Sequence, residues 1–519
     1  MLQVEDKVNR LLDKMKKLGM ISKELYSDLF VSGTVPGILY GLPKVHKLLV
    51  PLRPIFSACG TPTFKLAKHL VSLLAPLTVN DYTVKNSYQF ADDIRKFEVK
   101  DGMFMASFDV ENLFTNIPVK ETIDIYIESL FRNCTTVAGI AKSCFRSMLE
   151  ISVLNSYFIF DQKLYQQVDG VGMGLPLGPT FANAFLCYHE QHWLDNCPLK
   201  FRPVYFRRYV DDCFMIFKHP SHVNKFLEYL NVQHPKMKFT KETEVNDTIS
   251  FLDVQVKRTG TGLETSVYRK KTFTGLGTSF SSFIPMVIKK AIVKSAIFRA
   301  FRISSSYKLF DLEVKFLTSF FCMNGFPKQL IEFSVNDFLR KRFNMDEVFV
   351  SVKKLEKYFV LPYFGDQSAN MQKDVVALLA KFYPFVNPKI VLRNKRTIGT
   401  FFRYKDKLPK PNHSGVVYNY SCASCQASYV GSTYQRLFTR VAQHQGKSHR
   451  TGQMLSTPPA SSIRDHVLSC NDPLTIGNFD ILAKNSSFPD LRILESLYIH
   501  RLRPQINDTS SAYPLNLTV

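Results

Sequence analysis

The sequence is poor in the features that mark secreted and membrane proteins. Its 519 residues include 10 cysteines, which are too few for a disulfide scaffold and fit a reducing compartment. No apolar run approaches the roughly 20 residues that a membrane-spanning helix needs. Residues 2–30 read as a charged amphipathic helix and not as a signal peptide. We therefore expect an intracellular protein that makes no membrane contact.

Acidic residues are also scarce relative to basic ones. The chain carries 67 Lys and Arg against 44 Asp and Glu, a net charge of +23. Residues 391–519 hold 16 basic and 7 acidic side chains, so the excess is shared between the tail and the rest of the chain. Such an excess favours a polyanionic partner, of which nucleic acid is the commonest. The 44 phenylalanines are enough to bury large cores, and the length predicts several domains.

Hydrophobic periodicity and turn residues predict the order of the elements. We expect helices at 2–30, 64–74, 119–131, 137–154 and 285–350, and strands at 103–109, 206–210, 213–217, 249–256 and 267–272. The prolines between Pro362 and Pro411 predict a linker over about 365–410. A compact tail that contains Cys and His clusters begins near Val416.

Three aspartates stand where apolar strands end. Asp109 closes the run MFMASFD, and Asp211 and Asp212 interrupt RRYVDDCFMIF at the tip of an expected hairpin. A buried carboxylate is costly unless its charge is compensated. The three side chains could be ordinary turn residues, a common place for Asp. Alternatively, they form a ligand set for two divalent cations, because Mg²⁺ prefers carboxylate and phosphate oxygens.

The amino-acid sequence around these aspartates resembles that of a known family. FDVENLF, GMGLPLGPTFAN and YVDD resemble motifs A, B and C of reverse transcriptases. LYGLPKVHK, LRPIFS, SFDVENLFTNIP, FLDVQV and YRKKTFTG together resemble Penelope-like retroelements, from about Gly37 to the C-terminus. The resemblance implies an α+β multidomain chain: a right-hand polymerase with fingers, palm and thumb, then a small α/β nuclease domain. The implied divisions are an N-terminal helical segment at 1–36, fingers and palm at 37–270, a helical thumb at 271–364, the linker at 365–410 and the nuclease at 411–519.

The same resemblance implies roles for individual polymerase residues. Asp109, Asp211 and Asp212 would be the catalytic triad that holds two Mg²⁺ ions. The other implied nucleotide-binding positions are Arg53 at the triphosphate, Val110 through its carbonyl at a metal, Phe114 against the sugar 2′ position, and Gly174 and Gly178 near the base pair. Phe114 could equally be a core residue. Lys44 and Lys47 are either phosphate contacts or a solvated basic loop. Lys289, Lys290, Lys294, Arg299 and Arg302 of the thumb would together follow a duplex backbone, although for any one of them a solvated helix face is the favoured interpretation.

The tail contains a second set of polar residues. Tyr418 and Tyr429 lie on two β-rich segments, and Arg440 and His444 share a helix face at i, i+4. Together with Gly431, Glu495 and Asn507, this set resembles the catalytic residues of the GIY-YIG nuclease family, with VVY and YVG as the namesake strings. Tyr or His would accept a proton, Arg would hold phosphate, and Glu would hold one Mg²⁺ ion.

Four further tail residues have the spacing of a zinc site. Cys422 and Cys425 form a CxxC, and His466 and Cys470 follow as H-x₃-C, which suits tetrahedral structural zinc. His444 and His449 remain competing ligands, and a redox-active CxxC is the alternative, although no thioredoxin-like context surrounds it.

We therefore expect an RNA-directed DNA polymerase with an attached DNA-nicking endonuclease, used for target-primed retrotransposition and located in the nucleus. Its partners would be an RNA template, a DNA target and primer, and deoxynucleoside triphosphates. An RNA-dependent RNA polymerase or an intron-maturase-like reverse transcriptase is the second hypothesis. A third is a catalytically inactive or non-autonomous nucleic-acid-binding relic. It rests on the roughly 36 residues before GILYGLPK, fewer than the family usually carries. The sequence does not indicate an oligomeric state.

Overall fold

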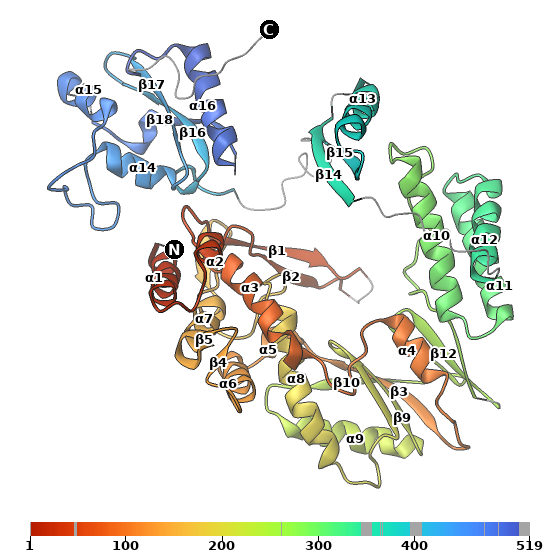
Figure 1. Ribbon diagram of the computed structural model, residues 1–519. Helices are drawn as coiled ribbons and strands as arrows, with labels where there is room; N and C mark the ends of the chain where they lie inside the picture. Colours follow the sequence, from red (N-terminus) through yellow and green to blue (C-terminus); the bar gives the residue numbers. More distant parts are fainter. Residues whose placement is uncertain are drawn as a thin grey trace. The chain divides into compact units, whose positions relative to one another are not determined.

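The computed structural model of the protein describes residues 2–45, 49–260, 262–343, 355–363, 365, 367–394, 407–471, 473–485 and 487–507 (Figure 1). The chain forms two compact units. One contains Met1–Glu264 together with Lys405–Val519, and the other contains Thr265–Tyr404. Within the described ranges, no helix has both the length and the apolarity that crossing a membrane requires.

The chain starts with two helices instead of the single helix expected over 2–30. Helix α1 spans Leu2–Lys17 and α2 spans Lys23–Leu29. Gly19 has φ 69°, a left-handed conformation that ends α1. The side chain of Ser22 caps α2 by accepting a hydrogen bond from Leu25 N. Hydrophobic residues at helix spacing, among them Val8 and Leu12, bury one face of α1 in the main core.

A four-stranded sheet of order β2-β1-β6-β7 follows. Its strands are β1 (Gly37–Pro43), β2 (Leu52–Ser57), β6 (Tyr157–Phe160) and β7 (Lys163–Gln166), and the neighbouring helices in the chain are α3 (Phe64–Leu74) and α7 (Lys142–Leu154). The expected bounds of α3 are confirmed, and α7 begins five residues later than predicted. Lys47 lies outside the described residues.

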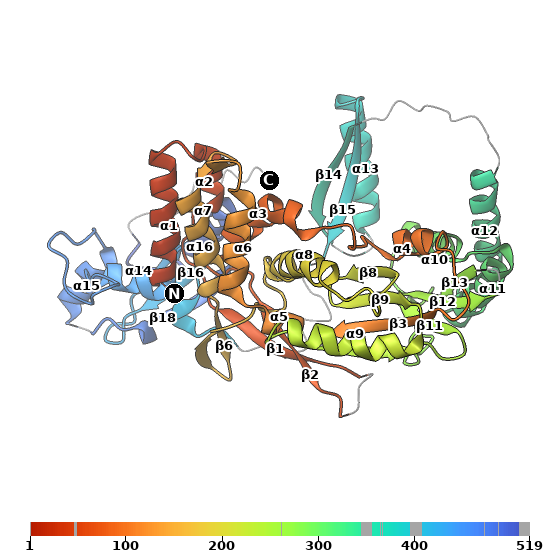
Figure 2. The ribbon, with the colours of Figure 1, turned by 90° about the horizontal axis from the view of Figure 1, so that it is seen from below.

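A second four-stranded sheet, antiparallel throughout, has the order β10-β3-β9-β8. The strands are β3 (Phe104–Val110), β8 (Tyr205–Tyr209), β9 (Asp212–Phe217) and β10 (Phe239–Thr243), accompanied by α4 (Ser87–Ile94), α5 (Leu113–Asn116), α6 (Val119–Leu130), α8 (Gly178–Asp195) and α9 (Pro220–Gln233). Alternate residues of β9 serve opposite faces of the sheet. Phe217 packs against Phe226 of α9, whereas Phe214 packs against Phe90 of α4. Figure 2 shows α9 running along β3 and α8 beside β8 and β9.

The strand expected at 249–256 is two strands. β11 (Thr248–Phe251) and β12 (Val254–Thr259) form an antiparallel hairpin. Leu252, with φ 55°, makes the turn between them, and its apolar side chain conceals that turn in the sequence. The strand expected at 267–272 was also misplaced, because β13 spans Gly262–Val267.

The unit Thr265–Tyr404 begins with a helical bundle and continues with a β-α-β segment. The bundle contains α10 (Met286–Ile303), α11 (Tyr307–Met323) and α12 (Lys328–Phe343), around a core that includes Ile297, Phe321 and Ile331. Strands β14 (Leu355–Pro362) and β15 (Val386–Arg393) pair in parallel, and α13 (Gln367–Phe382) connects them.

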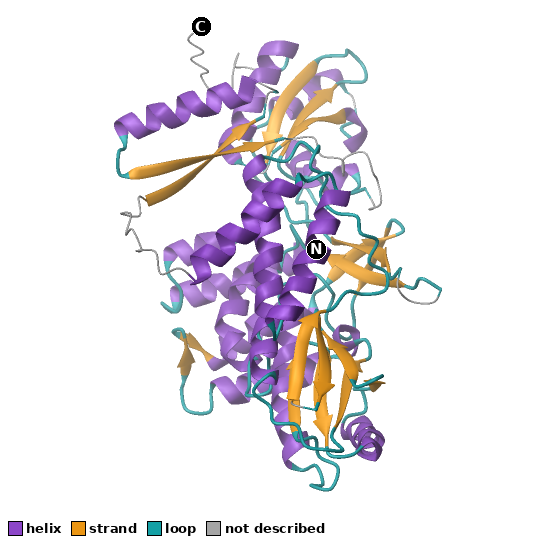
Figure 3. Cartoon of the chain, turned by 90° about the vertical axis from the view of Figure 1, so that its right-hand side faces the viewer, coloured by secondary structure: helices purple, strands orange, loops and turns teal. Residues whose placement is uncertain are grey.

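The linker prediction was therefore wrong over 367–393. In Figure 3 the two strands form a long orange pair beside a purple helix. The prolines that led to the prediction occupy positions that this structure tolerates. Pro362 ends β14, Pro384 follows α13, and Pro388 lies in a two-stranded sheet whose strands are both edges.

The C-terminal part of the first unit, Lys405–Val519, contains a three-stranded antiparallel sheet with helices and is called the C-terminal domain below. Strand β16 (Val416–Ser421) lies between β17 (Ser428–Thr433) and β18 (Phe479–Lys484). The helices are α14 (Leu437–His444), α15 (Ser462–Cys470) and α16 (Phe488–Leu502).

Candidate active sites

Asp109 and Asp212 lie directly opposite each other across the β3–β9 pair. Because opposed residues of an antiparallel pair project from the same face, both carboxylates point to one side of the sheet. Asp211 lies beside them at the hairpin tip, where its carbonyl accepts a hydrogen bond from Val110 N at 3.1 Å. The structure thus places Asp109, Asp211 and Asp212 next to one another along the backbone, with Val110 beside them, but their carboxylate oxygens do not form a compact ligand cluster. All three aspartates are half-buried.

This arrangement fits a divalent cation. Opposed side chains in an antiparallel pair have Cβ atoms about 5 Å apart, and like charges at such positions repel. A cation bound between Asp109 and Asp212 would offset that repulsion, and oxygen ligands are those that Mg²⁺ prefers. Asp109, Asp211 and Asp212 therefore carry the type of ligand that Mg²⁺ prefers, at neighbouring backbone positions.

The glycine-rich loop before α8 packs against β2. Phe56 N donates to Met173 O at 2.7 Å. Gly174 has φ 108°, and a Cβ at this position would lie 2.3 Å from Phe56 O, so the loop requires glycine here. Gly178 begins α8, and a Cβ there would lie 3.6 Å from Cδ1 of Phe114. The partly buried Phe114 ring therefore lies against the start of α8.

Two other predicted triphosphate contacts lie on or near β2. Arg53 is exposed on this strand and pairs in register with Leu42 of β1. Lys44 N donates to Pro51 O, which closes the start of the loop between β1 and β2. The loop at 170–178 joins the edge of the same strand through Phe56, so Arg53 and Gly174 belong to one connected segment.

Two basic residues predicted to follow a duplex have partners within their own unit. Lys289 is buried, and its Nζ donates to Phe280 O and to Ser282 O at 2.8 Å. Lys294 Nζ donates to Asp337 at 3.1 Å. Lys289 therefore holds the loop before α10, and the prediction that it contacts a backbone phosphate was wrong. Its sequence context does not distinguish it from exposed Lys290.

Tyr418 is the centre of the polar cluster in the C-terminal domain. It lies opposite Gly431 in the β16–β17 pair. A Cβ on Gly431 would come within 2.7 Å of both Tyr418 Oη and Tyr429 Cε1. The two rings therefore cover Gly431 closely, which explains the glycine in the YVG string. Tyr429 is half-buried beside the Tyr418 ring, with a centroid distance of 6.5 Å.

A chain of hydrogen bonds passes through the fully buried Tyr418 hydroxyl. Arg440 Nε donates to Tyr418 Oη at 3.2 Å, Tyr418 Oη lies 2.8 Å from His444 Nε2, and His444 Nδ1 lies 2.7 Å from Ser461 Oγ. Burial, followed by the charges of Arg440 and Arg464, lowers the pKa of His444 to about 3. A neutral His444 can accept the Tyr418 proton at Nε2 and donate from Nδ1 to Ser461. Burial also raises the pKa of Tyr418.

Glu495 closes the cluster from α16. Its carboxylate accepts from Ser432 N at 2.8 Å and from Ser432 Oγ at 2.9 Å, and lies 3.3 Å from Arg492. Carboxylate oxygens are also the ligands that Mg²⁺ prefers. Asn507 instead bonds the backbone of Val430 in both directions at 2.9 Å, which extends the edge of β17. Sequence reasoning missed Ser432 and Ser461, because serine carries no distinctive signal at either position.

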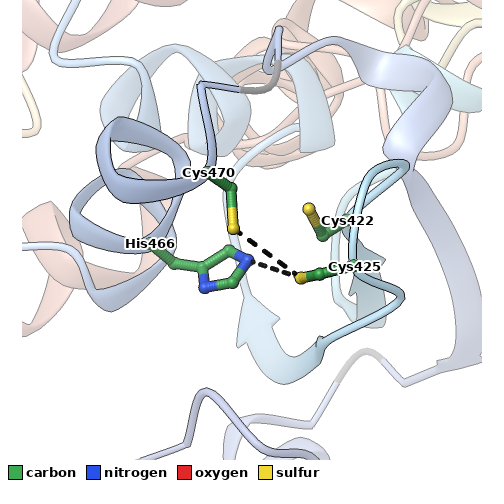
Figure 4. Close-up of side chains that lie close together, drawn as sticks. All are labelled: Cys422, Cys425, His466 and Cys470. Carbon is green, nitrogen blue, oxygen red and sulfur yellow. Dashed lines mark hydrogen bonds between the residues drawn. The ribbon is translucent and has the colours of Figure 1, made fainter.

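The four predicted zinc ligands come together (Figure 4). The donor atoms of Cys422, Cys425, His466 and Cys470 all lie within 4.8 Å of one another, and they form the one such cluster among the described residues. The Cys425 sulfur lies 3.3 Å from His466 Nε2 and 3.8 Å from the Cys470 sulfur. Three sulfurs and one imidazole suit tetrahedral zinc. His444 is bonded to Tyr418 and Ser461, and His449 is not a member of the cluster.

Comparisons with known proteins identify two segments. Residues 52–256 match the family model described as reverse transcriptase (RNA-dependent DNA polymerase). Residues 278–336, which include α10, α11 and part of α12, match an animal helix-turn-helix domain. No curated protein matches the chain.

Several solved polymerases resemble the fold. Telomerase from Candida albicans in complex with a fragment of telomeric RNA matches at 12% identity over 59% of this chain and 57% of that chain, with a TM-score of 0.40. Apo telomerase from Candida tropicalis matches at 12% identity over 60% of each chain, with a TM-score of 0.39. A sicinivirus RNA-dependent RNA polymerase matches at 14% identity over 60% of this chain and 71% of that chain, with a TM-score of 0.39. The chain spans less than two thirds of these telomerases. The expected mixed helix-and-strand polymerase fold is confirmed by the family match, and the chain contains, over residues 52–256, a reverse transcriptase domain.

Proposed function

We propose that the chain is the mobility enzyme of a Penelope-like retroelement: an RNA-directed DNA polymerase joined to a GIY-YIG endonuclease that nicks DNA. The observation that carries the polymerase half is the placement of Asp109 opposite Asp212, with Asp211 beside them, in a reverse transcriptase domain. Like charges at opposed positions repel each other, and a cation bound between them would offset that repulsion.

In the polymerase half, Asp109, Asp211 and Asp212 would hold two Mg²⁺ ions, with the Val110 carbonyl as a further ligand. When bound there, Mg²⁺ would supply activation of the primer 3′-hydroxyl and charge neutralisation at the leaving pyrophosphate. Arg53 binds the triphosphate through its planar guanidinium. Phe114 lies against Gly178, and its ring would exclude a ribose 2′-hydroxyl and so favour deoxynucleotides.

In the nuclease half, Tyr418 takes a proton from the attacking water while it passes its own proton to Nε2 of His444. The 2.8 Å contact supports this route, because it joins the Tyr418 hydroxyl directly to Nε2 of His444. Arg440 stabilises the charge that develops on the Tyr418 oxygen and on the phosphate, and Glu495 holds one Mg²⁺ ion. The cluster of three cysteines and His466 holds zinc and braces the small domain, a structural role.

The two halves together serve target-primed synthesis in the nucleus. The nuclease nicks target DNA, and the polymerase extends the freed 3′-hydroxyl on the element's RNA. The net charge of +23 and the basic excess in both parts of the chain support RNA and DNA as the ligands.

Primer extension on an RNA template with Mg²⁺ and deoxynucleotides tests the polymerase half. We expect the wild type to extend and the double variant Asp211→Ala/Asp212→Ala to lose extension by several orders of magnitude. Asp101→Ala removes an exposed carboxylate just before β3 and should extend like the wild type. A wild type no more active than the double variant would favour a non-catalytic relic.

Nicking of supercoiled plasmid tests the nuclease half separately. Tyr418→Phe should abolish nicking, because it removes the hydroxyl between Arg440 and His444. Tyr498→Phe is the matched control: its hydroxyl in the same domain donates to Leu482 O and serves no step of the proposal. Equal nicking by the two variants would contradict the assignment.

A further inference from the structure

A fully buried arginine lies beneath the aspartate hairpin. Arg208 of β8 is 2% exposed, although it is directly followed by Tyr209 and the loop that carries Asp211. Burying a guanidinium is unfavourable unless its charge and its donors are satisfied. Its neighbour Arg207 faces the other side of the sheet, where it lies 3.9 Å from Asp93 of α4.

The guanidinium group of Arg208 joins α8 to the hairpin through hydrogen bonds. Its Nε donates to Glu190 Oε2 at 2.9 Å, and one terminal nitrogen donates to Asn183 Oδ1 and to Val210 O, each at 3.1 Å. The other terminal nitrogen lies 3.2 Å from the sulfur of Cys187. Asn183, Cys187 and Glu190 are spaced i, i+4 and i+7, so they form one polar stripe on α8. The guanidinium therefore bridges a rigid helix to a backbone carbonyl of the loop.

That carbonyl belongs to an unusual residue. Val210 is the first of the two residues between β8 and β9, and it has φ 56°. Hairpin loops with positive φ usually take Gly or Asn at such a position. For a β-branched residue this conformation is a genuine outlier, which persists only where its surroundings impose it.

The Val210 carbonyl also sets the position of Asp211. The Val210 C=O and the Asp211 N–H share one planar peptide unit, so fixing the carbonyl fixes the direction in which Asp211 begins. On its other side, Asp211 is held by the bond from Val110 N to its own carbonyl at 3.1 Å. Arg208 and Val110 thus restrain the two peptide units that flank Asp211.

We propose that Arg208 is a positioning residue of the polymerase: it holds the strained Val210 peptide so that Asp211 presents its carboxylate to the metal ion. The inference rests on the proposed polymerase function. Glu190 balances the buried charge, while Asn183 and Val210 receive the bonds that set the geometry. Because Gly178, at the start of α8, lies against Phe114, the same helix connects the sugar-contacting ring to the aspartate turn.

The test uses the full chain and Mn²⁺ as the probe ion. Mn²⁺ affinity is measured by electron paramagnetic resonance for the wild type, Asp109→Asn, Arg208→Lys and Arg202→Lys. Lysine keeps the charge but cannot reach Glu190 and Val210 together. Arg202→Lys is the matched control, because Arg202 also donates to a carbonyl, that of Leu194, away from the hairpin.

We expect Arg208→Lys to weaken the Asp109-dependent Mn²⁺ affinity by on the order of tenfold, as is usual for partners of metal ligands. Arg202→Lys should match the wild type. In primer extension, the Mg²⁺ concentration for half-maximal rate should rise similarly in Arg208→Lys, while KM for the deoxynucleotide changes less than threefold. If Arg208→Lys does not fold, the double variant Arg208→Met/Glu190→Leu removes both buried charges and should fold, yet show the same loss of affinity.

Wild-type Mn²⁺ affinity in Arg208→Lys, or a lower melting temperature with unchanged metal dependence, would overturn the proposal and leave Arg208 a purely structural residue. Mn²⁺ binding that is insensitive to Asp109→Asn would overturn this inference together with the metal site. A wild type that binds Mn²⁺ through Asp109 but extends no primer would refute the polymerase function alone, and the Mn²⁺ affinities would still decide the role of Arg208.

Discussion

Lowering the pH from 7 to 5 is expected to weaken the C-terminal domain by about 2 kcal/mol through a single side chain, His444. This histidine is 3% exposed. Burial and the nearby charges of Arg440 and Arg464 lower its pKa to about 3. In the unfolded chain it would titrate near 6.5. Below pH 6.5 the unfolded state therefore binds a proton that the folded state does not, and stability falls as the pH falls.

The magnitude follows from the difference between the two pKa values. Between about pH 6.5 and 3, each unit by which the pH falls lowers the free energy of unfolding by about 1.4 kcal/mol. The loss is therefore about 2 kcal/mol at pH 5, and it is complete only near pH 3. Above pH 6.5 His444 contributes no further change. The sign is opposite to that of a histidine that gains a carboxylate partner on folding.

Hydrogen exchange of the full chain, followed by mass spectrometry, measures this loss locally. Amides of β16 and β17, after correction for intrinsic rates, should lose roughly 25-fold in protection between pH 7 and 5. In His444→Gln most of that loss should vanish. His500→Gln, which changes an exposed histidine of α16, should behave like the wild type. Protonation of the cysteine cluster is common to all three proteins and cancels in the comparison. An identical pH dependence in His444→Gln would refute the reasoning.

Three further predictions concern other parts of the chain. Phe114→Ala should raise ribonucleotide incorporation, because it empties the space against Gly178; unchanged sugar discrimination in primer extension would sink this role. Metal analysis of purified protein should find about one zinc per chain, and Cys422→Ser should lose it; a zinc-free, normally folded wild type would refute the site. Glu5→Gln removes the charged partner of buried Arg436 and should lower the free energy of unfolding, measured in urea, by about 3–5 kcal/mol. Asp6→Asn changes a more exposed pair with Arg450 and should lower it by under about 1 kcal/mol.

The backbone positions of the aspartates could be predicted because the ends of apolar strands and the order of the motifs are visible in short stretches of the sequence. Asp109 and Asp212 end up opposite each other because apolar strands carry them to the same edge of one sheet. The zinc ligands were foreseeable from spacing, but the choice between His466 and His449 was not. It depends on where α15 places its first turns relative to the Cys422–Cys425 turn, and no local pattern encodes that distance.

Where the sequence failed, tertiary contacts overrode local character. Lys289 looks like one more cation on a basic helix, yet two carbonyls of the preceding loop draw it into the interior. Prolines near 362–388 indicated loose structure, yet Pro362 ends a strand, Pro384 follows a helix and Pro388 lies on an edge strand, all positions where proline is tolerated. Arg436 gave no signal at all, because its partners Glu5 and Thr34 lie about 400 residues away.

The pair Arg207 and Arg208 shows why a buried functional residue can escape a sequence reading. The two side chains have the same chemistry and adjacent positions, and strand parity sends them to opposite faces of the sheet. Arg207 lies opposite Phe214 and Arg208 opposite Cys213. Parity alone predicts that one of them meets the layer that contains α8, but it does not predict a carboxylate there. Glu190 lies on α8 among mostly apolar buried residues, and only the packing of α8 on the sheet makes it the partner of Arg208. The Arg208–Glu190 ion pair, the positive φ of Val210 and the position of Asp211 therefore all depend on how α8 packs against the β8–β9 hairpin.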